Sequence, residues 1–280
     1  MKRSALIQQL RLSPGYAVLL LWLFFLIASV GWIFLASIST TREIFTDNLL
    51  ASGPRFENFV KTWTTDNLPR YFLNSMFYAV TSCVGAILIG SPAAYVLGRK
   101  VFRGSGAITR AILAIMAVPS VMIVVPMYSI LSRAGLVGNI FTLVIMYISS
   151  LVPFTSFFLI GFFASLPGEL EEAATVDGCS QGRILWQIYL PLAQPGIITV
   201  SIFNFINIWN EYFISLVFSS RNELRSLSVG LQQIVLAKST SGDWAGLFAA
   251  VVIVFLPTLV IYIFLSDKII AGVTGGAVKG

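Results

Sequence analysis

The sequence predicts an all-α integral membrane protein with six transmembrane helices. Of its 280 residues, 57% are hydrophobic and only 11% are charged. The mean hydropathy of +0.87 is far above that of a soluble domain. Apolar stretches of about 20 residues recur along the chain, which is the length that a helix needs to cross the hydrocarbon core. Because lipid offers the backbone no hydrogen-bond partners, each stretch is expected to be helical.

The first two spans are predicted over residues 16–38 and 71–97. The first follows a short segment with Lys2, Arg3 and Arg11. It is longer than the apolar core of a secretory signal, which has about 7 to 15 residues, and we interpret it as a retained helix. The second carries small residues that suit close helix packing in lipid: Ser75, Ala79, Ser82, Gly85, Ala86, Gly90 and Ala93.

The segment between the second and third spans sets the predicted orientation. It contains Arg99, Lys100 and Arg103, with Arg110 just beyond. A dense basic cluster beside two spans is typical of a cytoplasmic loop. If this loop is cytoplasmic, the chain enters and leaves the membrane from the same side, and six spans place both termini in the cytoplasm. The net charge of +6 is attributed to such membrane-surface loops and not to nucleic-acid binding.

Four further spans complete the predicted architecture. They are expected over residues 111–131, 140–163, 197–218 and 244–265. Pro119 and Pro126 interrupt the third span, and Pro153 lies within the fourth. A polar segment, residues 164–194, separates the fourth and fifth spans and is placed in the cytoplasm by parity, as is the tail 266–280.

The polar segment 164–194 predicts two short helices that meet at a glycine. Carboxylates over residues 169–172 favour a helix N-terminus. Gly178 can take the left-handed conformation that ends a helix, and Ser180 can cap the next one. Helices this short are unstable alone in water, and a partner surface would cover their apolar side. The alternative is a helix lying on the bilayer, although such helices are usually rich in Lys and Arg.

The same segment carries a pattern of fixed spacing: Glu-Ala-Ala, three residues, Gly, nine residues, Ile-x-Leu-Pro. The residues that meet this pattern are Glu172, Ala173, Ala174, Gly178, Ile188, Leu190 and Pro191. The pattern resembles the EAA loop of permease subunits of bacterial ABC importers. The six spans, the basic loop, Asn74-Ser75 and Trp209-Asn210-Glu211 extend the resemblance over nearly the whole chain. We call residues 164–194 the EAA segment.

The resemblance implies one transmembrane domain, residues 1–280, with the type I ABC importer permease fold and a cytoplasmic EAA coupling loop. In this family the loop sits in a cleft of the ATPase subunit. The residues expected to couple to the ATPase are Glu172, Ala173, Ala174, Asp177, Gly178, Ile188, Leu190 and Pro191. The terminal run GVTGGAVKG is similar to tails of the second permease (MalG type) of maltose-type carbohydrate importers. Gly275, Gly276 and Lys279 are therefore expected to contact the ATPase; the alternative is a flexible, disordered end.

Four polar residues of the fifth predicted span fall within an arc of about 120°: Asn204, Asn207, Asn210 and Glu211. A carboxylate near the bilayer centre costs at least about 2.5 kcal/mol, so this face should avoid lipid. Two interpretations remain open. The side chains line the translocation path of a sugar, or they form hydrogen bonds across a helix interface.

The function implied by the resemblance is import of a sugar or oligosaccharide by alternating access, with no catalytic or metal site in this chain. Histidine, the usual general base, is absent. The chain also lacks a GxxxxGK[ST] phosphate loop, so ATP and Mg are expected on partner ATPase subunits.

The expected partners are ABC ATPase subunits, a second, MalF-like permease subunit, an extracytoplasmic solute-binding protein, the sugar and the bilayer of the bacterial inner membrane. Nucleic acid is not expected. One alternative function is the same architecture carrying an oligopeptide or a polyamine. Another is a membrane-embedded enzyme acting on lipid or polyprenyl substrates, which would need acidic or histidine residues clustered at one membrane face.

Overall fold

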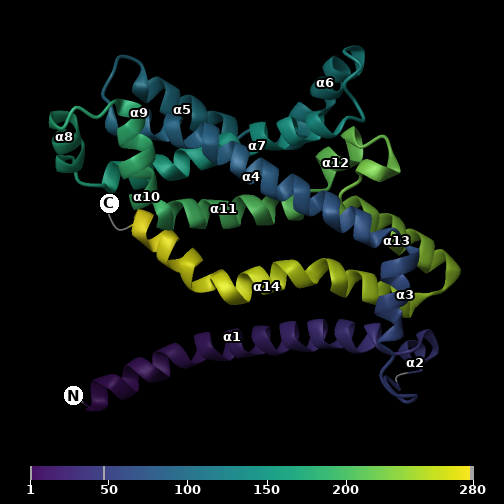
Figure 1. Cartoon of the computed structure of the whole chain (residues 1–280). Coiled ribbons are helices and arrows are strands. Elements are labelled where there is room, and N and C mark those ends of the chain that lie inside the picture. The colour runs from purple at the N-terminus through teal and green to yellow at the C-terminus, as the bar shows by residue number, and fades with distance from the viewer. Residues whose placement is uncertain (1, 47, 278–280) are drawn as a thin grey trace. The chain divides into compact units, whose positions relative to one another are not determined.

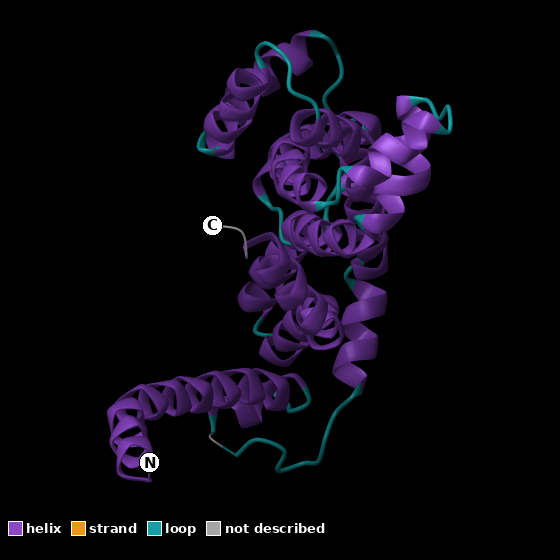
Figure 2. Cartoon of the chain, turned by 90° about the vertical axis from the view of Figure 1, so that its left-hand side faces the viewer, coloured by secondary structure: helices purple, strands orange, loops and turns teal. Residues whose placement is uncertain are grey.

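The computed structural model describes the backbone of residues 2–46 and 48–277, and the side chains of residues 14–46 and 48–266. All regular elements in these ranges are helices (Figure 2). The chain divides into two compact units, which are described separately. One comprises Met1–Asp66 and Leu231–Phe255, and the other Asn67–Gly230 and Leu256–Gly280.

Four helices are long and apolar enough to cross a membrane, and two bent helix pairs raise this number to six if each pair is one span. The long helices are α1 (Lys2–Ser37), α4 (Leu68–Arg99), α7 (Ile140–Ser165) and α14 (Trp244–Ala277). The bent pairs are α5 (Ser105–Met116) with α6 (Ser120–Arg133), and Gln181–Leu192 with α11 (Gln194–Trp209). The second and fourth predicted spans agree with α4 and α7 to within a few residues, and the first agrees with the apolar part of α1, Pro14–Ser37.

The third and fifth predicted spans are not continuous helices. α5 and α6 meet at a bend of 92°, and Pro119 forms the N-cap of α6. The interruption predicted at Pro119 is confirmed, because proline lacks an N–H and restricts the residue before it. Pro126 lies inside α6 without ending it. The fifth span ends as α11 at Trp209, and a separate short helix, α12 (Phe213–Phe218), follows.

The tail expected beyond residue 265 is helical as far as the structure describes it. α14 extends to Ala277 and includes Gly275 and Gly276, so the expectation of a flexible end is wrong for these residues. Each residue added to an existing helix gains a hydrogen bond, and a glycine costs only about 1 kcal/mol relative to alanine. Lys279 lies outside the described residues.

α4, α7 and α11 lie side by side in the second unit (Figure 1). A Cβ atom added at Gly98 of α4 would lie 2.9 Å from the Ile160 carbonyl oxygen of α7, and one at Gly90 would lie 3.0 Å from Cγ2 of Thr155. At Gly98 the two backbones therefore approach as closely as glycine allows, and at Gly90 a side chain of α7 occupies the space of the missing Cβ atom. This confirms that the small residues of the second span serve close packing.

An apolar core surrounds the end of the α4–α7 pair near α12. It joins α4, α6, α7, α11 and α12 through buried side chains that include Tyr78, Val124, Leu143, Tyr147, Ile208 and Phe218. Tyr78 also donates a hydrogen bond of 2.8 Å to the Leu224 carbonyl oxygen. The connection that follows α12 is thereby attached to α4.

The segments between the predicted spans also contain helices. Between the first and second predicted spans lie α2 (Thr41–Phe45) and α3 (Glu57–Thr65), and α13 (Leu227–Ser241) lies between the fifth and sixth predicted spans. Thr40 and Glu43 form a reciprocal capping box at α2. Glu43 also accepts hydrogen bonds from the backbone N–H and the hydroxyl of Ser52, both at 2.6 Å.

We expect Gly98→Ala to destabilise the second unit by about 1–3 kcal/mol, because the new methyl group meets rigid backbone and not a movable side chain. Thermal unfolding in detergent would measure the loss. Gly161→Ala is the matched control, since a Cβ atom there has nothing within 4 Å. Equal melting temperatures for the two variants would contradict the packing argument.

Hydrogen bonds from Ser52 and Thr40 lower the pKa of Glu43 from its ordinary value of 4.5 to about 2. This carboxylate therefore stabilises the loop fully above the ordinary pKa, and its contribution is lost as the pH falls towards 2. At pH 6, the Ser52 amide should have a higher hydrogen-exchange protection factor in the wild type than in Glu43→Gln. The difference should shrink on acidification, and equal protection at pH 6 would refute this role.

Candidate functional site

The EAA segment forms the two short helices that the sequence predicts. They are α8 (Glu169–Val176) and α9 (Gln181–Ile184), followed by a π-helical turn, Leu185–Tyr189, and α10 (Leu190–Leu192). Gly178 has a φ of +77° and donates its N–H to Thr175, while the N–H of Cys179 reaches the Ala174 carbonyl oxygen at 2.9 Å. This pair of bonds is the Schellman arrangement that ends a helix. Ser180 caps α9 through the N–H of Arg183.

The apolar side of the EAA segment packs inside the chain. Buried side chains of α8, α9 and the π-helical turn meet α4 and α7 in one core: Ala94, Tyr95, Leu159, Phe163, Ala174, Ile184, Leu185 and Tyr189. The expectation that a partner covers this side is therefore wrong. The ends of α4 and α7 cover it themselves, through Ala94, Tyr95, Leu159 and Phe163.

The predicted coupling residues divide into an exposed and an internal group. Glu172, Ala173, Asp177, Gly178 and Pro191 are exposed. Ala174 is only 5% exposed, and Ile188 and Leu190 are half-buried against the same core. The exposed residues of α8, together with the 87% exposed Val176, are available to a partner. The internal residues Ala174, Ile188 and Leu190 pack on the inner side of the EAA segment, against the core that it shares with α4 and α7.

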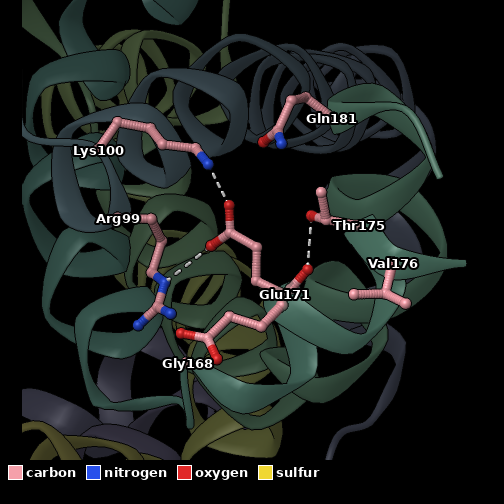
Figure 3. A pocket seen from close by; sticks show the side chains of 8 residues that line it. Arg99, Lys100, Gly168, Glu171, Thr175, Val176 and Gln181 are labelled. Carbon is pink, nitrogen blue, oxygen red and sulfur yellow. Dashed lines mark hydrogen bonds and ion pairs between the residues drawn. The ribbon is translucent and has the colours of Figure 1, made fainter. Parts of the chain in front are cut away.

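A polar cluster joins the inner side of α8 to the last turn of α4 (Figure 3). The Glu171 carboxylate accepts a hydrogen bond of 3.1 Å from the Tyr95 hydroxyl and one of 3.5 Å from Nε of Arg99. Nζ of Lys100 also donates to this carboxylate. Figure 3 shows the Arg99 and Lys100 side chains directed at Glu171 from the same side. Gln181, at the start of α9, lies with its Oε1 atom 3.0 Å from the Tyr95 hydroxyl.

Arg99 reaches two further parts of the EAA segment. Its Nη1 atom donates a hydrogen bond of 3.0 Å to the Leu166 carbonyl oxygen, in the connection between α7 and α8. Its guanidinium carbon lies 5.3 Å from the centre of the Tyr189 ring, within the range of a cation–π contact. One side chain of α4 therefore contacts the residues before α8, within α8 and after α9.

Burial by itself would raise the pKa of Glu171, but the opposing effects are larger. Hydrogen bonds from Lys100 and Tyr95, with the positive charges of Lys100 and Arg99, hold the Glu171 pKa below its ordinary value. The carboxylate is consequently ionised at neutral pH and carries the charge that its two cationic neighbours require.

Sequence reasoning missed this cluster. From the sequence, Arg99 and Lys100 indicate only the orientation in the membrane, and Glu171 indicates only the acidic first turn of a helix. Glu171 lies three residues before Ala174 and therefore on the same side of α8, but only the structure shows that this side is buried. The partners on α4 are distant in sequence, so nothing local indicates them.

The four polar residues of the fifth predicted span do not share one helical face, because α11 ends at Trp209. Asn204 is 1% exposed and donates a hydrogen bond of 2.8 Å from Nδ2 to the Thr155 hydroxyl of α7. Glu211 accepts the backbone N–H groups of Ile214 at 2.6 Å and Ser215 at 3.1 Å, at the start of α12.

Tyr147 of α7 donates its hydroxyl to Glu211 at 3.1 Å. Asn204 and Glu211 therefore form hydrogen bonds across helix interfaces, which is the second of the two interpretations. Asn207 and Asn210 are exposed, and Asn210 donates from Nδ2 to the Ile206 carbonyl oxygen at 2.8 Å.

Comparison with known proteins identifies related chains over nearly the whole length. The permease protein NgcG of a diacetylchitobiose uptake system in Streptomyces coelicolor is 33% identical over 266 residues, which cover 95% of this chain and 88% of the relative. The trehalose transport system permease protein SugB of Mycobacterium tuberculosis is 29% identical over 269 residues, covering 96% and 95%.

The fold also has a solved counterpart. The crystal structure of a bacterial ABC transporter involved in the import of the acidic polysaccharide alginate contains a chain with a TM-score of 0.79 and 25% identity. The match covers 92% of this chain and 96% of that chain. The model of the family described as "binding-protein-dependent transport system inner membrane component" matches residues 86–273. This chain therefore belongs to the family of inner-membrane components of binding-protein-dependent transport systems.

Proposed function

We propose that this chain is a permease subunit that moves a sugar or an oligosaccharide through the membrane, driven by ATPase subunits that dock on α8. The observation that carries the docking proposal is the division of α8 into a buried inner side and an exposed outer side. A short helix held rigidly from behind is suited to receive force on its free side. The sugar class follows from similarity to permeases named for diacetylchitobiose and trehalose.

The proposed docking surface consists of Glu172, Ala173, Asp177 and Gly178, with Pro191 further along the segment. Asp177 and Gly178 lie at the end of α8, where the Schellman turn exposes them. Ala174, Ile188 and Leu190 support this surface from within and do not touch the ATPase. Nucleotide hydrolysis, with ATP and Mg, belongs to the ATPase subunits, and this chain contributes no catalytic group.

The remaining partners follow from the same proposal. A solute-binding protein delivers the sugar, and a second, MalF-like permease subunit completes the translocation path. We place both chain termini and the EAA segment in the cytoplasm. Direct contact of the basic residues Arg99 and Lys100 with Glu171 of the EAA segment supports one membrane side for both, and a basic cluster beside spans favours the cytoplasm.

The translocation path is proposed to include Asn207 and Asn210, whose side chains are exposed in the second unit. Amide groups can both donate to and accept from sugar hydroxyls. Asn204 and Glu211 instead stabilise the helices that carry the path. Gly275, Gly276 and Lys279 remain proposed ATPase contacts on the basis of the tail resemblance alone.

We expect Glu172→Lys to abolish sugar uptake and to reduce co-purification of the ATPase subunits, because the new positive charge lies on the docking surface. The protein should still insert into the membrane. Glu223→Lys, an equal charge change at an exposed residue near the other end of α4, should leave the ATPase association unchanged. Normal uptake by well-expressed Glu172→Lys protein would refute docking on α8.

We expect Asn204→Leu to reduce stability and Asn207→Leu to reduce uptake. Loss of the buried bond to Thr155 should lower the melting temperature of Asn204→Leu, at a cost of about 1–3 kcal/mol for the unpaired partner. Asn207→Leu should keep the wild-type melting temperature and show reduced uptake. If Asn207→Leu protein transports normally, Asn207 is not on the path.

A further inference from the structure

α8 is connected directly along the chain to α7 and α9 but not to α4. On one side the connection 166–168 joins it to α7, and on the other the turn 177–180 joins it to α9. α4 has no covalent connection to α8 and reaches it only through side chains. Contacts between α8 and α4 therefore decide whether α4 follows when α8 moves.

The polar part of this contact centres on one carboxylate. The Glu171 side chain is 12% exposed and that of Arg99 is 14% exposed, so solvent and salt screen this pair less than a surface pair. Lys100 adds a second cation at 38% exposure. Removing Glu171 would leave two neighbouring cations without their partner, which is costly at partly buried positions.

α4 is also well placed to pass a displacement on. Gly98, which immediately precedes Arg99, lies against the backbone of α7 at Ile160 and Ala164. A movement imposed on Arg99 therefore acts on two helices whose backbones already touch. The Arg99 bond to the Leu166 carbonyl oxygen ties the same guanidinium to the connection between α7 and α8.

We propose that Glu171 is a positioning residue that clamps α8 to the end of α4 through Arg99, Lys100 and Tyr95, so that displacement of α8 by the ATPase moves the α4–α7 pair. This inference rests on the proposed function, because it assumes that force arrives on the outer side of α8. Glu172 and Glu171 then have different roles at adjacent positions. Glu172 faces the ATPase subunit, and Glu171 transmits the displacement of α8 to α4.

The test separates docking from transmission in the complete transporter. Glu171→Ala should reduce uptake by about tenfold or more, within the range typical of coupling between sites. The ATPase subunits should co-purify as with the wild type and continue to hydrolyse ATP. The number of ATP molecules hydrolysed per sugar imported should therefore rise, which a simple loss of folded protein would not cause.

Three controls make the result specific. Glu223→Ala removes an exposed carboxylate near the other end of α4, away from α8, and should leave uptake and the ATP-to-sugar ratio unchanged. Glu171→Gln keeps the side-chain size, and serves as the test variant if Glu171→Ala does not fold. Lys100→Gln added to Glu171→Gln should cause little further loss, because residues that act as one unit are not additive.

A distance measurement checks the clamp directly. Spin labels at Val176 of α8 and Val96 of α4, introduced after Cys83→Ser and Cys179→Ser, should give a narrow distance distribution in the otherwise wild-type protein. With Glu171→Ala the distribution should broaden. An unchanged distribution would overturn the clamp.

The outcomes also distinguish this inference from the proposed function. Normal uptake by Glu171→Ala, together with loss of ATPase association in Glu172→Lys, would overturn the clamp and leave docking intact. Loss of ATPase association in Glu171→Ala would also overturn it, because Glu171 would then serve docking itself. If Glu172→Lys retains both association and uptake, the proposed function fails first.

Discussion

The backbone contact between α4 and α7 is the constraint on which the candidate site depends. Gly98 allows the two helices to approach until a Cβ atom would meet the Ile160 carbonyl oxygen at 2.9 Å. Because Tyr95, Arg99 and Lys100 lie within one turn of Gly98, the same contact places their side chains against the EAA segment. A wider separation would leave the inner side of α8 without cover and the Glu171 carboxylate without its cationic partners.

A second constraint is hydrogen bonding of the backbone where a span is broken. Lipid cannot satisfy free N–H groups, so an irregular backbone within a span needs partners from the protein. After α11 ends, the Glu211 carboxylate accepts the N–H groups of Ile214 and Ser215. Tyr147 attaches that carboxylate to α7. The acidic residue that would be costly in a continuous span is thus what allows the break and the restart as α12.

Periodicity and turn chemistry were sufficient to predict much of the secondary structure of this protein. Apolar stretches located the spans, Gly178 and Ser180 marked the junction of α8 and α9, and the spacing from Glu172 to Pro191 identified the family. The expectation of one polar face that includes Asn210 and Glu211 failed because it assumed that the fifth apolar run is one helix, whereas α11 ends at Trp209 and α12 begins at Phe213.

The sequence by itself determined that the chain is helical, lies in a membrane and carries a short polar element between two spans, because these properties follow from composition, period and local turn signals. Only the tertiary structure decided which side of that element is free. Glu171 and Glu172 are chemically identical neighbours, and Glu171 is largely covered by α4 while Glu172 is exposed. That distinction arises from contacts with Tyr95, Arg99 and Lys100, more than 70 residues away, which no local pattern encodes.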